Sequence, residues 1–389
     1  PESNVSRVVF NSCAVTSEAV RQVKQSIRKT RKQNPDVEIV VTGCAAQIDP
    51  DIFEHMAEVD HVIGNEEKLS PDIWSRLSTE RVIVNDIMNI KETAPQMIAG
   101  FKGRFRAFAQ IQQGCDHRCT FCIIPYGRGN CRSVPIGEIV KQFRLLIKNG
   151  YKEFVLTGVD ITSYGPDLPG QPRLGTMIKR LLKNVEGIER LRLSSVDPSE
   201  IDEDLLDLIA NEKRLMPSLH LSVQAGNDLI VKRMKRRHLR DDVIKLSTLL
   251  REIRPDIVLG ADLIAGFPTE TDEMFKQTID LISDAELLHL HIFPYSARTG
   301  TPAAKMPQVT SKIKKMRARL LREAGAELVA EHLSKRVGRI ETVLLEQNDT
   351  GYTDQFFPMK VYGNHQPGEI ITAKVDNVME DNTLVGSTS

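Results

Sequence analysis

The sequence lacks any long hydrophobic run, and no apolar stretch reaches the roughly 20 residues that a transmembrane helix requires. We expect no secretory signal peptide, and cysteine is sparse, with six cysteines among 389 residues. Lysine plus arginine and aspartate plus glutamate both number 52, so the net charge at pH 7 is zero. These absences predict a protein of the reducing cytoplasm without a membrane partner, in which any nucleic-acid surface must be a local patch.

The few cysteines are unevenly distributed, because three of them, Cys115, Cys119 and Cys122, form a C-x3-C-x2-C pattern. Thiolates at this spacing can bind an iron–sulfur cluster, zinc or copper(I). Structural zinc requires a fourth protein ligand, for which His117 and Cys131 are the candidates, whereas a [4Fe-4S] cluster with one open iron needs only three. Both interpretations stay open from the spacing, and the apolar residues around the third cysteine favour the cluster.

Residues 1–97 alternate strands with helices, which is typical of a parallel, doubly wound α/β sheet. Four strands and one long helix are predicted, over residues 5–10, 38–42, 61–63 and 81–84 and over 16–32. Cys13 and Cys44 each follow a strand, and because parallel strands end at one edge of a sheet, we expect the two thiols near each other. The alternative is two structural cysteines that pack as small hydrophobic residues. A strand so close to Pro1 predicts that an upstream segment is missing.

Residues 98–333 repeat a strand–helix unit about every 35 to 40 residues, after a predicted linker over residues 93–103 that contains proline and glycine. Six strands are predicted, over residues 107–112, 153–156, 191–194, 218–223, 257–264 and 288–293. Parallel strands with outer helices predict an open (β/α)6 barrel, in which binding sites gather at the carboxyl ends of the strands.

The residues that follow these strands are candidates for binding a ligand. A glycine allows the backbone to approach a ligand closely, and serine, aspartate and glutamine side chains can form hydrogen bonds with it. The predicted cofactor-binding residues are Gly158, Asp160, Ser195, Asp197, Gln224 and Gly266. No side chain in the sequence is identified as catalytic.

Residues 334–389 predict a small β-barrel or meander, because apolar and polar residues alternate between glycine and Asn-Asp turns. Its strands are predicted over residues 339–346, 351–361, 369–375 and 382–386. Tyr352, Phe356 and Phe357 could stack on nucleic-acid bases, unless at least two of them belong to the core. Basic runs over residues 232–240 and 312–322 are either RNA contacts or solvated faces, and the position of the first beside the binding edge favours RNA contact.

Several motifs resemble those of a known family. The three-cysteine loop, with Phe121 just before the last cysteine, resembles the signature of the radical S-adenosylmethionine (SAM) superfamily. The stretches NSCAVT around Cys13 and VTGCAAQ around Cys44 resemble two of three cysteine motifs of the methylthiotransferases. The last residues resemble the TRAM domain, a small nucleic-acid-binding barrel of tRNA-modifying enzymes.

The resemblance implies cofactors for each of these sites. Cys115, Cys119 and Cys122 would hold a [4Fe-4S] cluster whose open iron is chelated by SAM, and the six strand-end residues would contact SAM. Cys13 and Cys44 would bind a second [4Fe-4S] cluster together with a third cysteine, which in the family lies upstream of the position that corresponds to Pro1.

The resemblance also implies a reaction. Within the methylthiotransferases, the sequence motifs are most similar to those of one branch. Enzymes of this branch replace the C2–H of N6-threonylcarbamoyladenosine with a methylthio group at position 37 of tRNA, next to the anticodon. The implied partners are tRNA and an electron donor such as flavodoxin or ferredoxin. The alternatives are a methylthiotransferase acting on isopentenyladenosine or a ribosomal protein, and a zinc-dependent RNA-binding protein without catalytic activity.

Overall fold

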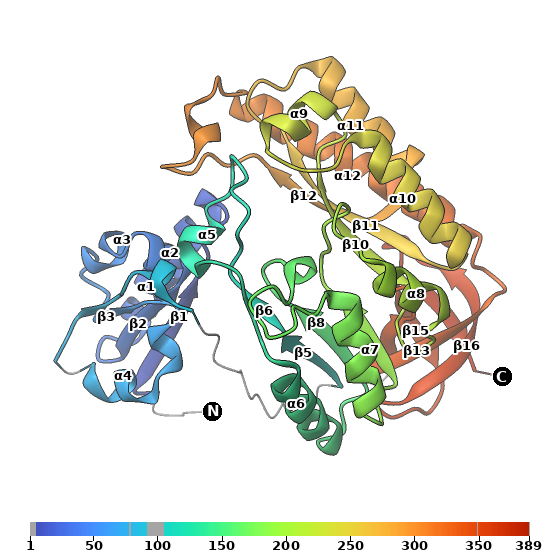
Figure 1. Ribbon diagram of the computed structural model, residues 1–389, viewed down its shortest axis with the longest axis horizontal. Helices are drawn as coiled ribbons and strands as arrows, with labels where there is room; N and C mark the ends of the chain where they lie inside the picture. Colours follow the sequence, from blue (N-terminus) through green and yellow to red (C-terminus); the bar gives the residue numbers. More distant parts are fainter. Residues whose placement is uncertain (1–4, 78, 92–104, 348, 389) are drawn as a thin grey trace. The chain divides into compact units, whose positions relative to one another are not determined.

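The computed structural model describes residues 5–77, 79–91, 105–347 and 349–388 (Figure 1). The chain forms two compact units. Unit 1 contains residues 1–94, 113–132 and 296–306, and unit 2 contains residues 95–112, 133–295 and 307–389. The linker predicted over 93–103 lies outside the described residues, as does the predicted domain boundary after residue 97.

Unit 1 is built around a parallel sheet with the strand order β1-β2-β3-β4. Its strands and helices are β1 (Arg7–Ser12), α1 (Ser17–Gln33), β2 (Glu38–Gly43), α2 (Cys44–Ile48), α3 (Asp51–Glu54), β3 (His61–Ile63), α4 (Pro71–Arg76), β4 (Val82–Ile83) and α5 (Ile124–Arg128). The Thr16 hydroxyl caps α1 by accepting a 3.1 Å hydrogen bond from the Ala19 N–H, as the sequence predicts. Apolar residues of α1, α3 and the strands form the core, including Ile27, Ile39, Phe53 and Val62.

Unit 2 contains the predicted (β/α)6 barrel as two parallel three-stranded sheets, β5-β8-β9 and β10-β11-β12. The strands are β5 (Arg106–Gln110), β8 (Glu153–Thr157), β9 (Arg190–Leu193), β10 (Ser218–Gln224), β11 (Val258–Ala265) and β12 (Leu287–Pro294). The helices are α6 (Ile136–Lys148), α7 (Leu174–Asn184), α8 (Glu203–Asn211), α9 (Asp228–Arg233), α10 (Arg240–Ile253), α11 (Asp272–Asp284) and α12 (Ser311–Ser334). Within the described residues, only isolated bridges, such as Val196 with Leu221, join β9 to β10. The predicted α/β fold class is confirmed.

The last segment of unit 2 is a closed barrel of five strands, β13-β14-β15-β17-β16. The strands are β13 (Ile340–Gln347), β14 (Thr350–Thr353), β15 (Pro358–Tyr362), β16 (Ile370–Val378) and β17 (Leu384–Ser387). The single strand predicted over 351–361 is wrong, because the chain turns between β14 and β15. Phe356 has a φ of 71° in this turn, and its N–H donates to the Thr353 carbonyl. This closed barrel confirms the predicted C-terminal β module.

The small barrel contacts the base of the (β/α)6 barrel through a buried ionic network. The Glu153 carboxylate is fully buried among the guanidinium groups of Arg106, Arg190 and Arg192. Arg192 also donates to the Thr353 and Asp354 carbonyls of the β14–β15 turn, at 2.9 and 2.8 Å. Although burial opposes ionisation, the three arginines hold the pKa of Glu153 below its usual range.

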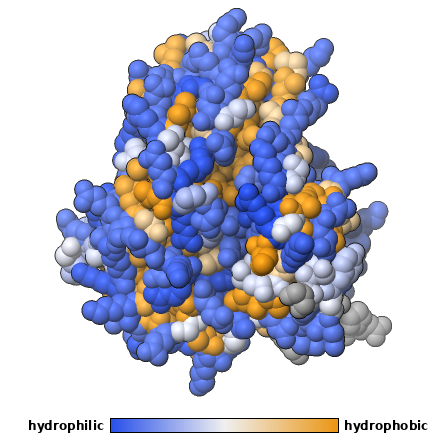
Figure 2. Space-filling view, turned by 90° about the vertical axis from the view of Figure 1, so that its right-hand side faces the viewer, coloured by the Kyte–Doolittle hydropathy of each residue, from blue (hydrophilic) through white to orange (hydrophobic). Residues whose placement is uncertain are grey.

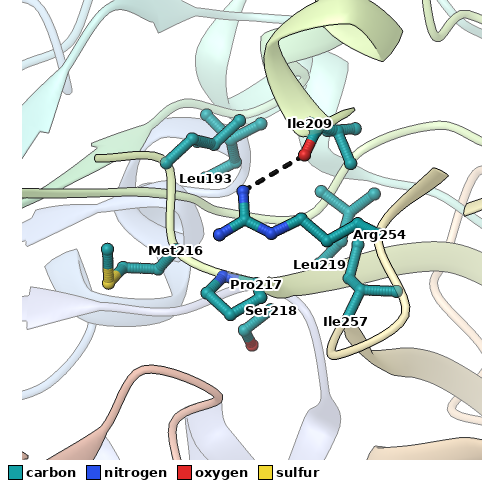
Figure 3. A pocket seen from close by; sticks show the side chains of 9 residues that line it. Leu193, Ile209, Met216, Pro217, Ser218, Leu219, Arg254 and Ile257 are labelled. Carbon is teal, nitrogen blue, oxygen red and sulfur yellow. Dashed lines mark hydrogen bonds between the residues drawn. The ribbon is translucent and has the colours of Figure 1, made fainter. Parts of the chain in front are cut away.

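The surface shows no single dominant hydrophobic area in the view of Figure 2, and one small cavity of unit 2 is too small for a ligand. Figure 2 shows hydrophobic areas interspersed among hydrophilic ones, as is normal for a globular protein. The cavity in Figure 3 measures about 10 Å³, roughly the space of one water molecule, and Arg254 closes it by donating to the Ile209 carbonyl. Within the described residues, no helix combines the length and apolar character needed to cross a membrane.

Candidate functional site

The three-cysteine loop of unit 1 lies between two short paired strands, β6 (Gln112–Gln113) and β7 (Arg132–Ser133). The Cys122 N–H donates to the Cys119 carbonyl, which turns the loop back on itself, and the Cys115 N–H donates to the Gly129 carbonyl, both at 3.1 Å. Gly114 has a φ of 73°, and a Cβ there would lie 1.9 Å from the Asn130 carbonyl oxygen. The backbone therefore imposes one shape on the segment that carries the three thiols.

Cys13 and Cys44 lie at neighbouring strand ends, because Ser12 and Gly43, which precede them, are register partners in β1 and β2. The Ser12 hydroxyl stabilises this edge by donating to the Thr42 carbonyl and accepting from the Ala46 N–H. Cys13 is exposed and Cys44 is buried. The structure thus brings the two thiols to the same edge, as the parallel-strand argument predicts.

Positive charge surrounds Cys44. The Arg128 Nε lies 3.0 Å from the Cys44 Sγ, and α5 approaches so closely that a Cβ on Gly127 would lie 3.0 Å from the Cys44 Cβ. Burial and Arg128 together lower the pKa of Lys68, which also interacts with Cys44, to about 8. Two cationic side chains, those of Arg128 and Lys68, therefore lie near the buried thiol of Cys44.

One cavity inside unit 1 is lined by residues adjacent to both sets of cysteines. This cavity has a volume of about 250 Å³. Its lining includes the residues that follow three of the cysteines, namely Ala14, Ala45 and Ile123, together with Arg298. Arg298 donates to the Ser17 hydroxyl at 3.2 Å, and its guanidinium interacts with the Cys13 thiol. The cavity therefore lies beside the carboxyl edge of the sheet and the residue that follows the three-cysteine loop.

In unit 2, the predicted strand-end residues after β8 take part in a hydrogen-bond network. The Gln112 side-chain oxygen accepts from the N–H groups of Val159 and Asp160, at 2.9 and 2.8 Å. Gly158 is needed for this approach, because a Cβ there would lie 2.8 Å from that same oxygen. The Asp160 carboxylate accepts from the hydroxyls of Thr162 and Ser163. These bonds give the turn after β8 a defined conformation.

Asp197, after β9, is joined to this network and to the first basic run. Its N–H donates to the Thr162 hydroxyl, and its carboxylate forms ion pairs with Arg236 at 3.1 Å and with Arg237 at 3.3 Å. Burial opposes ionisation, but Arg236, Ser199 and Arg237 together lower the pKa of Asp197. The expectation that this run contacts RNA is wrong for Arg236, because its side chain is 9% exposed and holds Asp197.

The residues at the carboxyl ends of β10 and β11 include two with left-handed backbone conformations. Gln224 has a φ of 72°, as does Gly266. The Gly266 N–H donates to Glu270, whose carboxylate also accepts a 2.8 Å hydrogen bond from the buried Arg317. Burial raises the pKa of Glu270 to about 7, and Arg317 works against that rise. Of the predicted strand-end residues, Ser195 lines the interior cavity of the barrel.

That interior cavity contains polar side chains that the sequence motifs do not indicate. It has a volume of about 580 Å³ and is lined by both sheets and by the β14–β15 turn. His220, Asp262 and His291 meet there from three neighbouring strands, with donor atoms within 4.8 Å of one another. The sequence signal for this cluster was the alternation of residues along β10 and β12, which points every second side chain inward.

Of the aromatic residues proposed to stack on bases, Phe357 is buried in the small barrel, while Tyr352 and Phe356 stack on each other against Arg106.

Comparison with known proteins identifies the class to which this protein belongs. Residues 109–282 match the family described as "Radical SAM superfamily", and residues 2–64 match "Uncharacterized protein family UPF0004". Among solved structures, the radical S-adenosylmethionine methyltransferase TsrM from Kitasatospora setae aligns with a TM-score of 0.57 at 16% identity, covering 77% of this chain and 65% of that one. The fold and the three-cysteine loop are those of a radical SAM enzyme, a class that uses SAM and a [4Fe-4S] cluster.

The relatives narrow the class to a family. The chain is 52% identical to "Threonylcarbamoyladenosine tRNA methylthiotransferase MtaB" of Rickettsia prowazekii, over 96% of this chain and 88% of the relative. It is 32% identical to "tRNA-2-methylthio-N(6)-dimethylallyladenosine synthase" of Acetivibrio thermocellus, over 97% of this chain and 78% of the relative. The chain therefore belongs to the radical SAM methylthiotransferase family. This membership excludes the non-catalytic zinc protein.

Proposed function

We propose that this protein methylthiolates C2 of N6-threonylcarbamoyladenosine in tRNA, next to the anticodon, with SAM and two [4Fe-4S] clusters. The relatives support the substrate, because the identity is 52% to the protein named for threonylcarbamoyladenosine and 32% to the one named for dimethylallyladenosine. The observation that carries the proposal is the 250 Å³ cavity of unit 1, which is lined by the residues that follow Cys13, Cys44 and Cys122 in the sequence.

The proposed ligands follow from the chemistry of the side chains. Cys115, Cys119 and Cys122 would hold the SAM-binding cluster, and Cys13 and Cys44 would contribute to the second. When bound, the first cluster supplies the electron for reductive cleavage of SAM, and the second supplies sulfur. The donor set fits this role, because thiolates are soft ligands that suit iron–sulfur clusters and the Arg128 guanidinium lies 3.0 Å from the Cys44 Sγ.

The residues of unit 2 would bind and orient the other reactants. Gly158, Asp160, Asp197, Gln224 and Gly266 would contact SAM, since their turns present polar groups at the carboxyl ends of the strands. Ser195 would face the substrate base instead, because it lines the interior cavity. A flavodoxin or ferredoxin would deliver the electron.

The surface of the small barrel would bind tRNA. Tyr362 is 56% exposed, and the Lys360 ammonium lies 5.2 Å from its ring centroid. A positive charge beside an exposed aromatic ring suits a backbone phosphate and a neighbouring base.

Nucleoside analysis of tRNA tests the proposed function. A strain that lacks the gene should accumulate N6-threonylcarbamoyladenosine and lose its 2-methylthio derivative, as measured by mass spectrometry. The wild-type gene should restore the derivative, and the Cys119→Ala variant should not. An unchanged nucleoside profile in the deletion strain would contradict the proposal, and loss of the dimethylallyl derivative instead would identify the second substrate.

A further inference from the structure

The interior cavity of unit 2 has two chemically different walls. The sheet β5-β8-β9 contributes Phe108 and Val155, and Phe108 is 62% exposed although it is a large hydrophobic residue. The sheet β10-β11-β12 contributes His220 and His291 to the lining. A volume of about 580 Å³ is within the usual range of small-ligand sites. An aromatic side chain on one wall provides a surface on which a base can stack, and the other wall can form hydrogen bonds.

The polar wall is organised around one carboxylate oxygen. The His220 Nε2 lies 3.0 Å and the His291 Nδ1 lies 3.2 Å from the same Oδ1 atom of Asp262. Although burial opposes ionisation, the two imidazoles lower the pKa of Asp262 to about 2, so this group is a carboxylate at neutral pH. A carboxylate only accepts hydrogen bonds, and therefore the His220 Nε2 and the His291 Nδ1 must each carry a proton.

This arrangement leaves His291 as the member of the cluster that a ligand can reach. Its side chain is 63% exposed, compared with 15% for His220 and 20% for Asp262. The His220 Nδ1 faces the backbone, because a Cβ on Gly260 would lie 2.6 Å from it. The two imidazole rings pack against each other with centroids 4.4 Å apart and planes tilted by 30°, which further restricts the His291 ring. Asp262 binds the Nδ1–H, so the Nε2 of His291 is available to a ligand.

The two guanidinium groups that also line the cavity already form ion pairs and hydrogen bonds with other residues. Arg106 pairs with Glu153 and Glu346, and Arg192 pairs with Glu153 and the β14–β15 turn. Asp262 raises the pKa of His291 and so favours its cationic form, in which Nε2 donates a hydrogen bond. Among the cavity-lining cations, His291 is therefore the one oriented toward a new anionic partner.

We propose that His291, positioned by Asp262 and His220, binds the carboxylate of the threonylcarbamoyl group and thereby selects this substrate over one with an apolar N6 substituent. The inference rests on the proposed function, because it takes the modified adenosine as the substrate. A site built to hydrogen-bond a polar group rejects analogues that lack it, since its own polar groups are then left without a partner. The adenine ring would stack against the wall that carries Phe108.

Selectivity between matched RNAs tests this assignment. Three anticodon stem-loops, identical except for a threonylcarbamoyl, a dimethylallyl or no group on N6 of the target adenosine, would be methylthiolated by the reconstituted holoenzyme without oxygen. The measured quantity is the ratio of kcat/KM for the threonylcarbamoyl and dimethylallyl RNAs. His291→Phe should lower kcat/KM for the threonylcarbamoyl RNA about 10- to 100-fold, the loss expected for a hydrogen bond to a charged group. It should leave the rate on the dimethylallyl RNA unchanged or higher.

Further variants separate binding from a structural effect. His291→Gln keeps an N–H donor and should recover part of the ratio, and Asp262→Asn should lower the ratio by removing the anion that orients His291. His55→Phe is the matched control, because His55 is an exposed histidine of unit 1 whose side chain makes a local hydrogen bond with the Asp51 carbonyl. SAM cleavage without RNA reports whether each variant keeps its cofactors. If the His291→Phe variant loses SAM cleavage, the ratio of kcat/KM values measured for the His291→Gln variant tests the assignment instead.

Two failures are distinguishable. If the wild-type enzyme does not methylthiolate the threonylcarbamoyl RNA, the proposed function is wrong and the assignment fails with it. If the wild-type enzyme prefers that RNA and the His291 and Asp262 variants keep the wild-type ratio, only the assignment of the carboxylate site is overturned.

Discussion

The cysteine-bearing edge of unit 1 and the interior cavity of unit 2 are assembled in different ways. In unit 1, four of the five candidate thiols lie on loops and Cys44 begins α2, and three of the five lie within one C-x3-C-x2-C segment. In unit 2, His220, Asp262 and His291 lie inside three separate strands, and only the register of the sheet brings them together. A local motif can therefore define the chemistry of the first site, whereas the second depends on long-range pairing.

This difference predicts a hierarchy of effects. Replacing a thiol should abolish a chemical step, because it removes one of the soft ligands that would hold the cluster. Replacing a side chain of the cavity or of the network beneath it should change stability or selectivity by a few kcal/mol, which is the usual size of a polar contact.

The largest expected effect comes from the three-cysteine loop. Cys119→Ala should abolish SAM cleavage and remove roughly four iron atoms per chain, because the [4Fe-4S] cluster would lose a ligand. Anaerobic iron analysis and chromatographic detection of 5′-deoxyadenosine measure both quantities. The control is Cys131→Ala, which should retain both. Full iron content in the Cys119→Ala protein would rule out its role as a ligand.

Variants of the sheet edge should separate the two proposed clusters. Cys13→Ala and Cys44→Ala should abolish methylthiolation while SAM cleavage continues, because they leave the three-cysteine loop intact. The two activities can be followed in one reaction by mass spectrometry of the RNA and of the nucleoside product. Normal methylthiolation by both variants would show that these thiols are structural.

An effect on stability is expected at the base of the cavity. Glu153→Gln should lower the free energy of unfolding of unit 2 by about 3–5 kcal/mol, because it removes the fully buried carboxylate that three buried guanidinium groups share. Denaturant unfolding measures the change. Glu189→Gln is the matched control, since the Glu189 carboxylate is half exposed and lies 3.8 Å from the Lys152 ammonium. Equal effects of the two variants would contradict a special role for the buried network.

The smallest effect concerns pH and the polar wall of the cavity. The pKa of Asp262 in the folded protein is lowered from its ordinary value near 4 to about 2, so its ionisation stabilises the fold above pH 4. This contribution is about 2 kcal/mol at most and should disappear as the pH falls toward 2. The difference in unfolding free energy between wild type and Asp262→Asn, measured from pH 3 to 7, should therefore shrink at the acidic end. A pH-independent difference would mean that the two histidines do not stabilise the carboxylate.

Local patterns were enough to predict most of the architecture. Alternation and strand–helix spacing located β1 to β3 and all six strands of the large barrel to within one or two residues at most ends, since these patterns act over a few positions. The strand predicted over 351–361 was wrong because Phe356 adopts a φ of 71°, a conformation that an apolar pattern does not signal.

The sequence alone also determined which side chains could act as soft metal ligands. Three of these thiols are close together in the chain, so hydrogen bonds between neighbouring peptide groups are enough to shape the loop that carries them. Tertiary structure decided the partners of the charged and polar side chains. The basic run holds Arg236, which in the fold pairs with Asp197 instead of facing solvent. In the same way, Asp262 acquires its two imidazole partners only where β10, β11 and β12 align. The physical reason is that hydrogen bonds and ion pairs act over about 3 Å, and such distances between remote residues exist only once the sheet has formed.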